Sequence, residues 1–239
     1  MIKKFDLSPN YSKKIRSKKA VKFIIVHYTG MQSEIESLER LKNIKSKVSC
    51  HYLINRKGSI IQMVKDNRVA WHAGKSKWKN YKNLNENSIG IELVNNGHKF
   101  GYQNFTDKQI KSLIILCKEL KKKFGIKKEN FLGHSDIAPL RKSDPGEKFP
   151  WKKLSQYDLG IWFKERKVDK EKFESTGKRN IYYQFFKNLY KIGYRYFKVN
   201  KRSVKDRLII MSFQKRFLPK KVTGKLDKKT YEISYFLAN

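Results

Sequence analysis

Three residues that lie far apart in the sequence could together hold a metal ion. His27 closes the apolar run 23–26, whereas His134 and Asp144 belong to the segment GHSDIAPLRKSDPG at 133–146. Two imidazoles and one carboxylate form a ligand set that suits Zn²⁺ and leaves a fourth position for water. Taken singly, each residue has an ordinary structural alternative, such as a turn residue for Asp144. The combination predicts a zinc hydrolase.

Two further residues could move a proton or stabilise charge beside such a metal. Glu92 stands in the apolar, strand-like run IGIELV at 89–94, where a carboxylate is costly unless it has a partner or a task. It could pair with a nearby lysine, or it could carry a proton from water to a leaving amine. Lys142 could be a solvated surface lysine or a fixed cation that faces a developing oxyanion. The residues alone leave these alternatives open.

The elements that position these residues follow from hydrophobic periodicity and turn signals. We expect buried or half-buried strands at 21–29, 51–56, 59–64, 88–94 and 131–133. Lys57 and Gly58 form a two-residue hairpin signal. A short helix should follow Ser33, and a long amphipathic helix should run from its cap at Thr106 to a stop at Gly125. Strands mixed with helices predict an α/β or α+β domain.

The chain divides at a polar segment, residues 164–180, which has the composition of a linker. Residues 1–163 would then form the catalytic domain. Residues 181–239 would form a small three-helix domain, with helical patterns at 181–196, 204–217 and 227–236.

The chain of 239 residues carries an extreme formal charge of +35, and 39% of its residues are hydrophobic. The charge could attract nucleic acid, an anionic membrane face or an acidic wall polymer, or it could reflect an AT-rich genome. Only 11 of the 56 basic residues are Arg. Because planar recognition of phosphate and guanine favours Arg, this shortage argues against nucleic acid as the partner.

Cysteine usage and hydropathy exclude several classes. Cys50 and Cys117 have no CxxC neighbours, so buried free thiols are expected rather than a disulfide framework or a thiolate zinc site. No run of 18 apolar residues is present, so no transmembrane segment is expected. The N-terminus is basic but shows no apolar core of a signal peptide. Either the protein is not exported by that route, or this sequence lacks its leader.

Five segments follow one another in a recognisable order: IIVHYTG at 24–30, SCHYLINRKGSIIQMV at 49–64, VAWHAGKSKW at 69–78, NENSIGIELVNNG at 85–97 and GHSDIAPLRKSDPG at 133–146. Together they resemble the zinc-dependent N-acetylmuramoyl-L-alanine amidases of the type-2 family, which also includes the peptidoglycan-recognition proteins. The resemblance covers roughly residues 20–155. It implies an α/β fold, a mixed β-sheet flanked by helices, with zinc in a groove above the sheet.

The resemblance implies a role for each chemical residue. His27, His134 and Asp144 match the three ligands of one Zn²⁺ per chain, Glu92 matches the catalytic acid/base, and Lys142 matches the lysine that stabilises the transition state. Recognition proteins and phage members usually have Cys where Asp144 stands. The set is therefore most similar to bacterial amidases that act on 1,6-anhydro-muropeptides, some of which also cleave intact wall.

Four residues near the ligands are candidates for binding substrate: Tyr28, Arg68, Trp71 and His72. Arg68 could meet a peptide carboxylate, and Tyr28 adjoins the first ligand. Trp71 and Trp78 could stack on sugar, with core packing as an equal alternative for each. Residue 28 is Tyr where many recycling enzymes have Asn, so the details of substrate recognition do not transfer.

The C-terminal segment resembles a peptidoglycan-binding module of three helices, through the signature FQ…VTG…D..T between Phe213 and Thr230. The alternative is a helical bundle that packs on the amidase and binds nothing.

The sequence therefore predicts a zinc amidase that cuts between the lactyl group of N-acetylmuramic acid and L-alanine, in cell-wall turnover or recycling. Its expected partners are peptidoglycan or muropeptide fragments, with no nucleic acid. The alternative is a peptidoglycan-binding protein with little catalysis, and a nucleic-acid binder is more remote. Substrate and domain pairing favour the cell envelope or periplasm, with the cytoplasm as the alternative. The sequence leaves the oligomeric state open.

Overall fold

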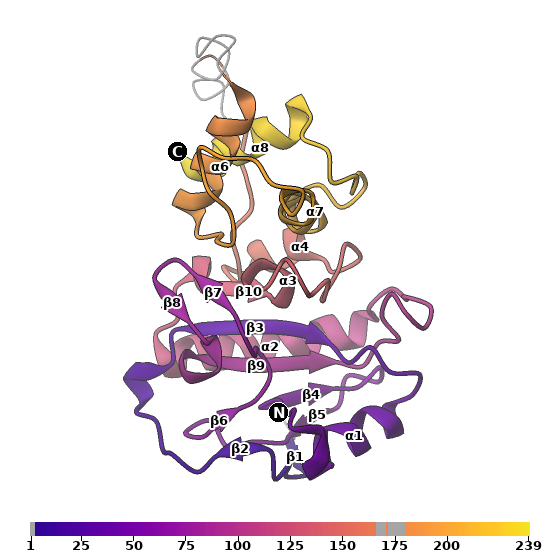
Figure 1. Ribbon diagram of the computed structural model, residues 1–239. Helices are drawn as coiled ribbons and strands as arrows, with labels where there is room; N and C mark the ends of the chain where they lie inside the picture. Colours follow the sequence, from indigo (N-terminus) through magenta and orange to yellow (C-terminus); the bar gives the residue numbers. More distant parts are fainter. Residues whose placement is uncertain (1–2, 166–170, 172–179) are drawn as a thin grey trace.

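The fold is given by a computed structural model that describes residues 3–165, 171 and 180–239 (Figure 1). A six-stranded sheet with the order β1-β5-β4-β9-β3-β10 forms its centre. The strands are β1 (Lys3–Phe5), β3 (Phe23–Tyr28), β4 (Tyr52–Ile54), β5 (Ile60–Gln62), β9 (Ser88–Leu93) and β10 (Phe131–Gly133). β4 and β5 are antiparallel, and the other neighbours are parallel. The expected mixed sheet is confirmed, and β4 and β5 form the expected hairpin, but residues 55–59 connect them instead of a two-residue turn at Lys57 and Gly58.

The two faces of the sheet are covered by different helices. Ile24 and Val26 of β3 belong to a buried cluster that includes the apolar face of α2 (Asp107–Phe124). Phe23 and Ile25 belong to a second cluster, which includes side chains of the C-terminal helices. Because side chains alternate along a strand, His27 shares the face of Phe23 and Ile25. The candidate ligand therefore projects to the side of the C-terminal helices.

The long helix α2 begins and ends where the sequence predicts. Thr106 accepts a hydrogen bond from the backbone N–H of Gln109, and the Gln109 side chain accepts one from the backbone N–H of Thr106. These two bonds form a capping box, which satisfies backbone donors that the first turn leaves unpaired. Gly125 ends the helix at φ +65°, a conformation that costs glycine little.

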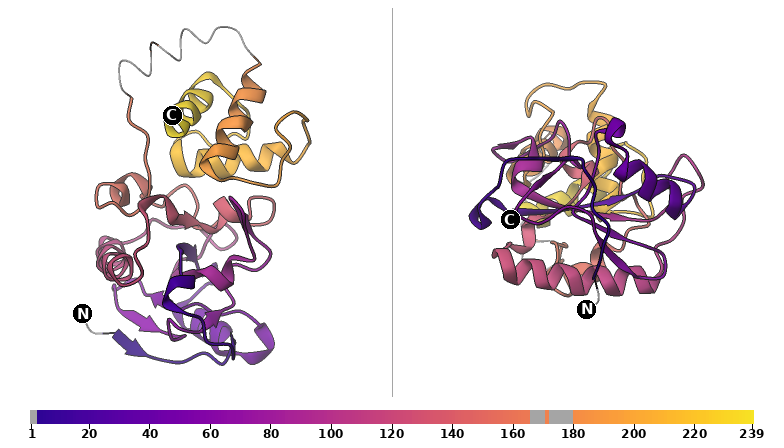
Figure 2. Two further views of the ribbon diagram at one scale, coloured as in Figure 1. Left: turned by 90° about the vertical axis from the view of Figure 1, so that its left-hand side faces the viewer. Right: turned by 90° about the horizontal axis from the view of Figure 1, so that it is seen from below.

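The remaining helices lie on the other side of the sheet or along its edge. They are α1 (Glu34–Lys42), α3 (His134–Ile137), α4 (Trp151–Ser155), α6 (Ile181–Ile192), α7 (Asp206–Phe217) and α8 (Lys228–Ala238). Ser33 caps α1 as expected, by accepting from the N–H of Glu36. Figures 1 and 2 show α6, α7 and α8 stacked on α3 and α4, away from the strands. The three C-terminal helices are confirmed.

Two expected helix boundaries are wrong by a few residues. The helix expected at 181–196 ends at Ile192, because Gly193 adopts φ +139°. A side chain at position 193 would clash with the ring of Trp78. The helix expected at 204–217 begins at Asp206.

Several short elements gave no readable pattern in the sequence. The two-residue strands are β2 (Tyr11–Ser12), β6 (Val69–Ala70), β7 (Lys77–Trp78) and β8 (Tyr81–Lys82). The 3₁₀ turns are η1 (Lys18–Ala20), η2 (Ile44–Ser46), η3 (Leu84–Asn87) and η4 (Lys128–Asn130). Segments this short contain too few residues to display a period of two or of 3.6.

Other expectations have mixed outcomes. Cys50 and Cys117 are buried free thiols, as predicted. No helix in the described part of the chain has the length and apolar character needed to cross a bilayer. The linker predicted at 164–180 falls mostly outside the described residues, so the domain boundaries stay predictions.

The C-terminal helices share a core with the sheet. Phe213 of α7 is fully buried, and its ring packs against those of Phe185, Tyr194 and Phe217. The same cluster contains side chains of β3 and β10. A contiguous apolar core predicts that the sheet and the C-terminal helices unfold together.

This cooperativity can be read with intrinsic fluorescence, since all four Trp residues (71, 78, 151 and 162) precede the C-terminal helices. Phe213→Ala should lower the stability reported by these Trp residues by about 3–5 kcal/mol, because it leaves a cavity in the shared core. Val204→Ala, at a position that is 93% exposed, is the control. A Trp transition that Phe213→Ala does not move would show that the two parts are independent.

Candidate active site

Strand register places two of the chemical residues side by side. β3 and β9 are parallel neighbours, and His27 is directly opposite Glu92. On the other side of β3, Gly133 of β10 pairs with Val26, so His134 emerges from the sheet next to His27. The register therefore assembles residues that are 65 and 107 positions apart in the chain.

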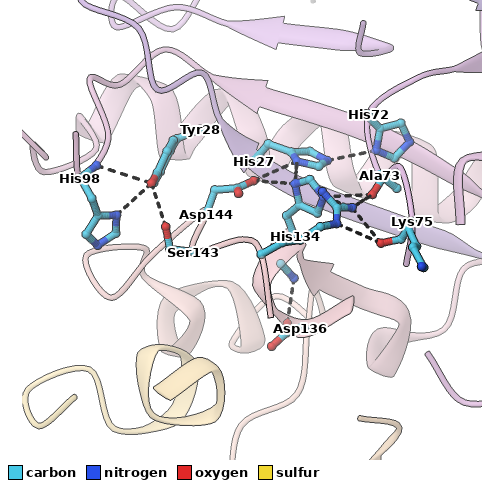
Figure 3. A network of polar contacts seen from close by, with 12 residues as sticks. His27, Tyr28, His72, Ala73, Lys75, His98, His134, Asp136, Ser143 and Asp144 are labelled. Atoms are coloured by element: carbon cyan, nitrogen blue, oxygen red, sulfur yellow. Dashed lines mark hydrogen bonds and ion pairs between the residues drawn. The ribbon is translucent and has the colours of Figure 1, made fainter. Parts of the chain in front are cut away.

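The three predicted ligands meet at one point (Figure 3). The Nδ1 atoms of His27 and His134 lie 3.0 Å apart, and each lies 3.0 Å from Oδ2 of Asp144. All three side chains are buried. Figure 3 shows them pointing toward one another from β3, α3 and the loop that follows α3.

A chain of hydrogen bonds fixes the tautomer of His27. The carbonyl of Leu84 can only accept, so the Ser88 hydroxyl donates to it, at 2.5 Å. The Ser88 oxygen then accepts from Nε2–H of His72 at 3.1 Å, which leaves Nδ1 of His72 to accept from Nε2–H of His27 at 3.0 Å. Burial, then the neighbouring His27, holds the pKa of His72 well below its usual range, so this ring is neutral. Nδ1 of His27 therefore carries a lone pair.

Gly90 makes room for this chain. A Cβ atom at position 90 would lie 2.3 Å from Cγ of His72, so any side chain there would displace the ring. The glycine in the IGIE segment thus allows His72 to pack against β9 and reach His27.

His134 is oriented in the same way by the main chain. Its Nε2–H donates to the carbonyl of Ala73 at 3.1 Å, so Nδ1 is the nitrogen that faces His27 and Asp144. Burial lowers the pKa of His27 to about 4. Although burial disfavours a charged carboxylate, the imidazoles of His134 and His27 hold the pKa of Asp144 well below its usual range. Two imidazole nitrogens and one carboxylate oxygen thus converge on one point.

When unprotonated, these three ligand atoms repel one another unless a cation lies between them. A tetrahedral ion with bonds of about 2.0–2.1 Å to N and O ligands has ligand–ligand edges of about 3.3 Å, close to the triangle seen here. The second nitrogen of each imidazole is held by a hydrogen bond, as is usual for histidines that bind metal. The set fits a metal ion with nitrogen and oxygen ligands.

Glu92 stands beside this triangle without a partner of its own. Its Oε2 atom is buried and accepts no hydrogen bond from the described residues. Burial, and then the nearby Asp144, raises the pKa of Glu92 to about 8, while Lys142 acts in the opposite direction. A carboxyl group whose pKa lies near neutrality can both accept and donate a proton.

The three candidate metal ligands line one cavity of about 690 Å³ together with Glu92 and Lys142. Of the predicted substrate-binding residues, Tyr28, Trp71 and His72 also line it. Both ring nitrogens of His72 are engaged in the hydrogen-bonded chain described above, so His72 orients His27, a candidate metal ligand.

Two predicted aromatic or cationic contacts lie elsewhere. Arg68 is not among the lining residues: its guanidinium donates to the carbonyl of Lys13 and lies over the Tyr11 ring. Trp78 is 2% exposed and packs edge-on against Tyr194, so the core alternative holds for it.

The sequence reasoning missed two groups beside the cavity. Arg141 lines the cavity and donates to the carbonyls of Ala73 and Lys75. Its position next to Lys142 in the motif was an available signal. The second group is a hydrogen-bonded chain beside Asp144, in which the Tyr28 hydroxyl donates to Nδ1 of His98, at 2.9 Å, and Nε2–H of His98 donates to Glu147, at 3.1 Å. No motif marked His98.

Comparison with known proteins agrees with this geometry. Residues 17–147 match the family model described as N-acetylmuramoyl-L-alanine amidase. The N-acetylmuramoyl-L-alanine amidase AmiD of Escherichia coli is 35% identical over 229 residues, which cover 90% of this chain and 81% of that protein. The chain belongs to the N-acetylmuramoyl-L-alanine amidase family.

Solved structures of such amidases superimpose on most of the chain. AmiD in complex with the substrate anhydro-N-acetylmuramic acid-L-Ala-D-γ-Glu-L-Lys gives a TM-score of 0.79 at 33% identity, over 95% of this chain and 91% of that one. AmpDh3 from Pseudomonas aeruginosa gives 0.82 at 31% identity, over 96% and 95%. The predicted family, fold and amidase activity are confirmed: the enzyme hydrolyses the amide bond between N-acetylmuramic acid and L-alanine.

The raised pKa of Glu92 makes a prediction about stability. Between about pH 4.5 and pH 8 the folded metal-free protein keeps a proton on Glu92 that the unfolded chain releases, so stability falls as pH rises. Glu92→Gln has no such proton. The stability of the metal-free variant relative to the metal-free wild type should therefore increase by up to about 1.4 kcal/mol per pH unit over this range.

Urea unfolding of both chelator-treated proteins at several pH values measures this difference. A difference that stays constant from pH 5 to pH 8 would show that the Glu92 carboxyl keeps an ordinary pKa.

Proposed function

We propose that the amidase reaction uses one Zn²⁺ per chain, held by His27, His134 and Asp144. The observation that carries this proposal is the convergence of three ligand atoms beside the unpartnered Oε2 of Glu92. When bound, zinc supplies Lewis-acid polarisation of the substrate carbonyl and makes water more acidic.

The residues of the chain supply the proton transfers and part of the charge stabilisation. Glu92 accepts the proton of the attacking water, which adds to the carbonyl carbon. It then donates that proton to the amine nitrogen of L-alanine as the C–N bond breaks. Lys142 lines the same cavity, and its ammonium stabilises the oxygen that gains negative charge in the tetrahedral transition state.

We further propose 1,6-anhydro-muropeptides as substrates. AmiD, which matches along nearly the whole chain, was solved with an anhydro-muropeptide as its substrate. AmpDh3 was solved with anhydromuramic pentapeptide. Tyr28 and Trp71, which line the cavity, are the candidate contacts for this ligand.

The domain assignment is part of the same proposal. Residues 1–163 would form the catalytic domain, 164–180 the linker, and 181–239 a peptidoglycan-binding-like helical domain. The proposed substrate of the protein, and its pairing of an amidase domain with a wall-binding-like domain, favour action in the cell envelope.

The substrate of the AmiD complex tests the proposal directly. Wild-type protein should contain one zinc per chain by elemental analysis. It should release free anhydro-N-acetylmuramic acid and the intact peptide, detected by mass spectrometry. Glu92→Gln should keep the zinc yet lose about 10²–10⁴-fold in turnover, because the isosteric amide cannot carry the proton. His27→Ala should lose zinc.

The outcomes separate the assignments. Full zinc retention by His27→Ala would contradict the ligand set, and an active Glu92→Gln enzyme would assign the proton transfer to another group. Wild-type protein that binds the muropeptide without cutting it would favour the alternative of a binding protein.

Lys142 gives an independent prediction. Lys142→Met keeps the length and apolar body of the side chain but removes its charge, so kcat should fall about 10²–10³-fold with little change in KM. Lys142→Arg should restore little, because a planar guanidinium does not replace a compact ammonium. Steady-state kinetics on the same substrate measure both. Near-normal rates in both variants would show that Lys142 takes no part in the reaction and is a solvated surface residue.

A further inference from the structure

Asp136 is a buried carboxylate next to the metal-binding triangle that the proposed reaction does not use. It lies in α3, two residues after the ligand His134, and is 1% exposed. Its Oδ2 atom accepts the backbone N–H of Gly133 at 2.8 Å. A buried charge of this kind is destabilising unless other groups pair with it.

Those other groups come from the C-terminal helices. Arg216 of α7, itself 3% exposed, forms an ion pair with Oδ2 of Asp136. The hydroxyl of Tyr194, just after α6, donates to Oδ1 at 2.6 Å. Arg216 also donates to the carbonyl of Phe131 in β10 at 3.0 Å, and its guanidinium lies over the ring of Trp151. The C-terminal segment thus forms a hydrogen bond and an ion pair with α3, and a hydrogen bond with β10, the strand that leads into it.

A third contact continues to the metal-binding loop. The Ser212 hydroxyl of α7 donates to the carbonyl of Ser135 at 2.7 Å. The N–H of Ser135 in turn donates to the carbonyl of Asp144 at 2.8 Å. Ser135 therefore connects α7 to the backbone of the residue that supplies the carboxylate ligand.

We infer that Tyr194, Ser212 and Arg216 are positioning residues for the metal site. They hold α3 where His134 and Asp144 meet His27. The C-terminal helices thus act on the catalytic centre, whether or not they also bind the wall. This inference rests on the proposed metal site.

The physical basis is the rigidity of a buried carboxylate whose two oxygens are both paired. Asp136 receives three donors, and each is fixed by a separate element: β10, the end of α6, and α7. Contacts that orient metal ligands without touching the metal typically contribute about 10–100-fold in metal affinity. Because binding couplings are reciprocal, a bound metal should also stabilise the docking of α7.

The test compares two double variants that each remove two buried hydroxyl groups. Tyr194→Phe with Ser212→Ala removes two hydrogen bonds to α3 and spares the Arg216 ion pair. Thr230→Val with Ser234→Ala is the matched control, since the hydroxyls of Thr230 and Ser234 bond only within the C-terminal segment. Both should lower the midpoint of thermal unfolding.

Zinc affinity distinguishes positioning from general stability. Competition with a chromophoric chelator, well below the unfolding midpoint, should give a zinc Kd at least about tenfold weaker for the first variant. The control should stay within about twofold of wild type. Equal zinc affinities for the two variants would overturn the inference.

Hydrogen exchange on the wild-type protein gives a second readout that needs no substitution. Removal of zinc should accelerate amide exchange in α3 and α7 more than in α8. Unchanged exchange in α7 would contradict the coupling. If wild-type protein binds no zinc, the metal assignment itself fails; if it binds zinc but the variants behave alike, only the positioning role fails.

Discussion

Mutual repulsion among three acceptor atoms is the constraint on which the rest of the structure depends. The lone pairs of His27 and His134 and the carboxylate of Asp144 face one another at 3.0 Å. Such an arrangement is stable only if every other atom around it is fixed and a cation balances the charge. His27 is bonded to His72, His134 to the carbonyl of Ala73, and the backbone carbonyl of Asp144 accepts from the N–H of Ser135. These contacts orient the two imidazoles and fix the backbone of the third ligand.

The same constraint explains the state of Glu92. Register places it directly opposite His27, where its Oε2 atom is buried and the charge of Asp144 is near. A carboxylate there is disfavoured until a cation arrives, because the cation reverses the sign of the local field. The candidate metal site and the proposed proton carrier are therefore electrostatically linked.

The sequence was sufficient for the elements with long periodic patterns and for the residues in motifs. The strand at 21–29 was predicted from its continuous apolar run, and the helix from Thr106 to Gly125 was predicted because its apolar residues recur along one face. Register was not predictable, since nothing local states that His27 lies opposite Glu92. The chain of hydrogen bonds from His27 through His72 to Ser88 was not predictable either, because the tautomer of a histidine depends on acceptors that folding brings next to it. Arg68 was misplaced for a related reason, as a motif gives a position in the chain and not the direction of a side chain.

The dependence of α3 on α7 has a consequence for the order of events during synthesis. Residues 206–217 leave the ribosome roughly 4–17 s after His134, at translation rates of about 5–20 residues per second. In that interval Phe23, Ile25 and the carboxylate of Asp136 lack the partners that later bury them. The nascent chain therefore carries an open apolar surface and an incomplete candidate metal site until α7 is synthesised, so we expect any metal to be acquired late in its maturation.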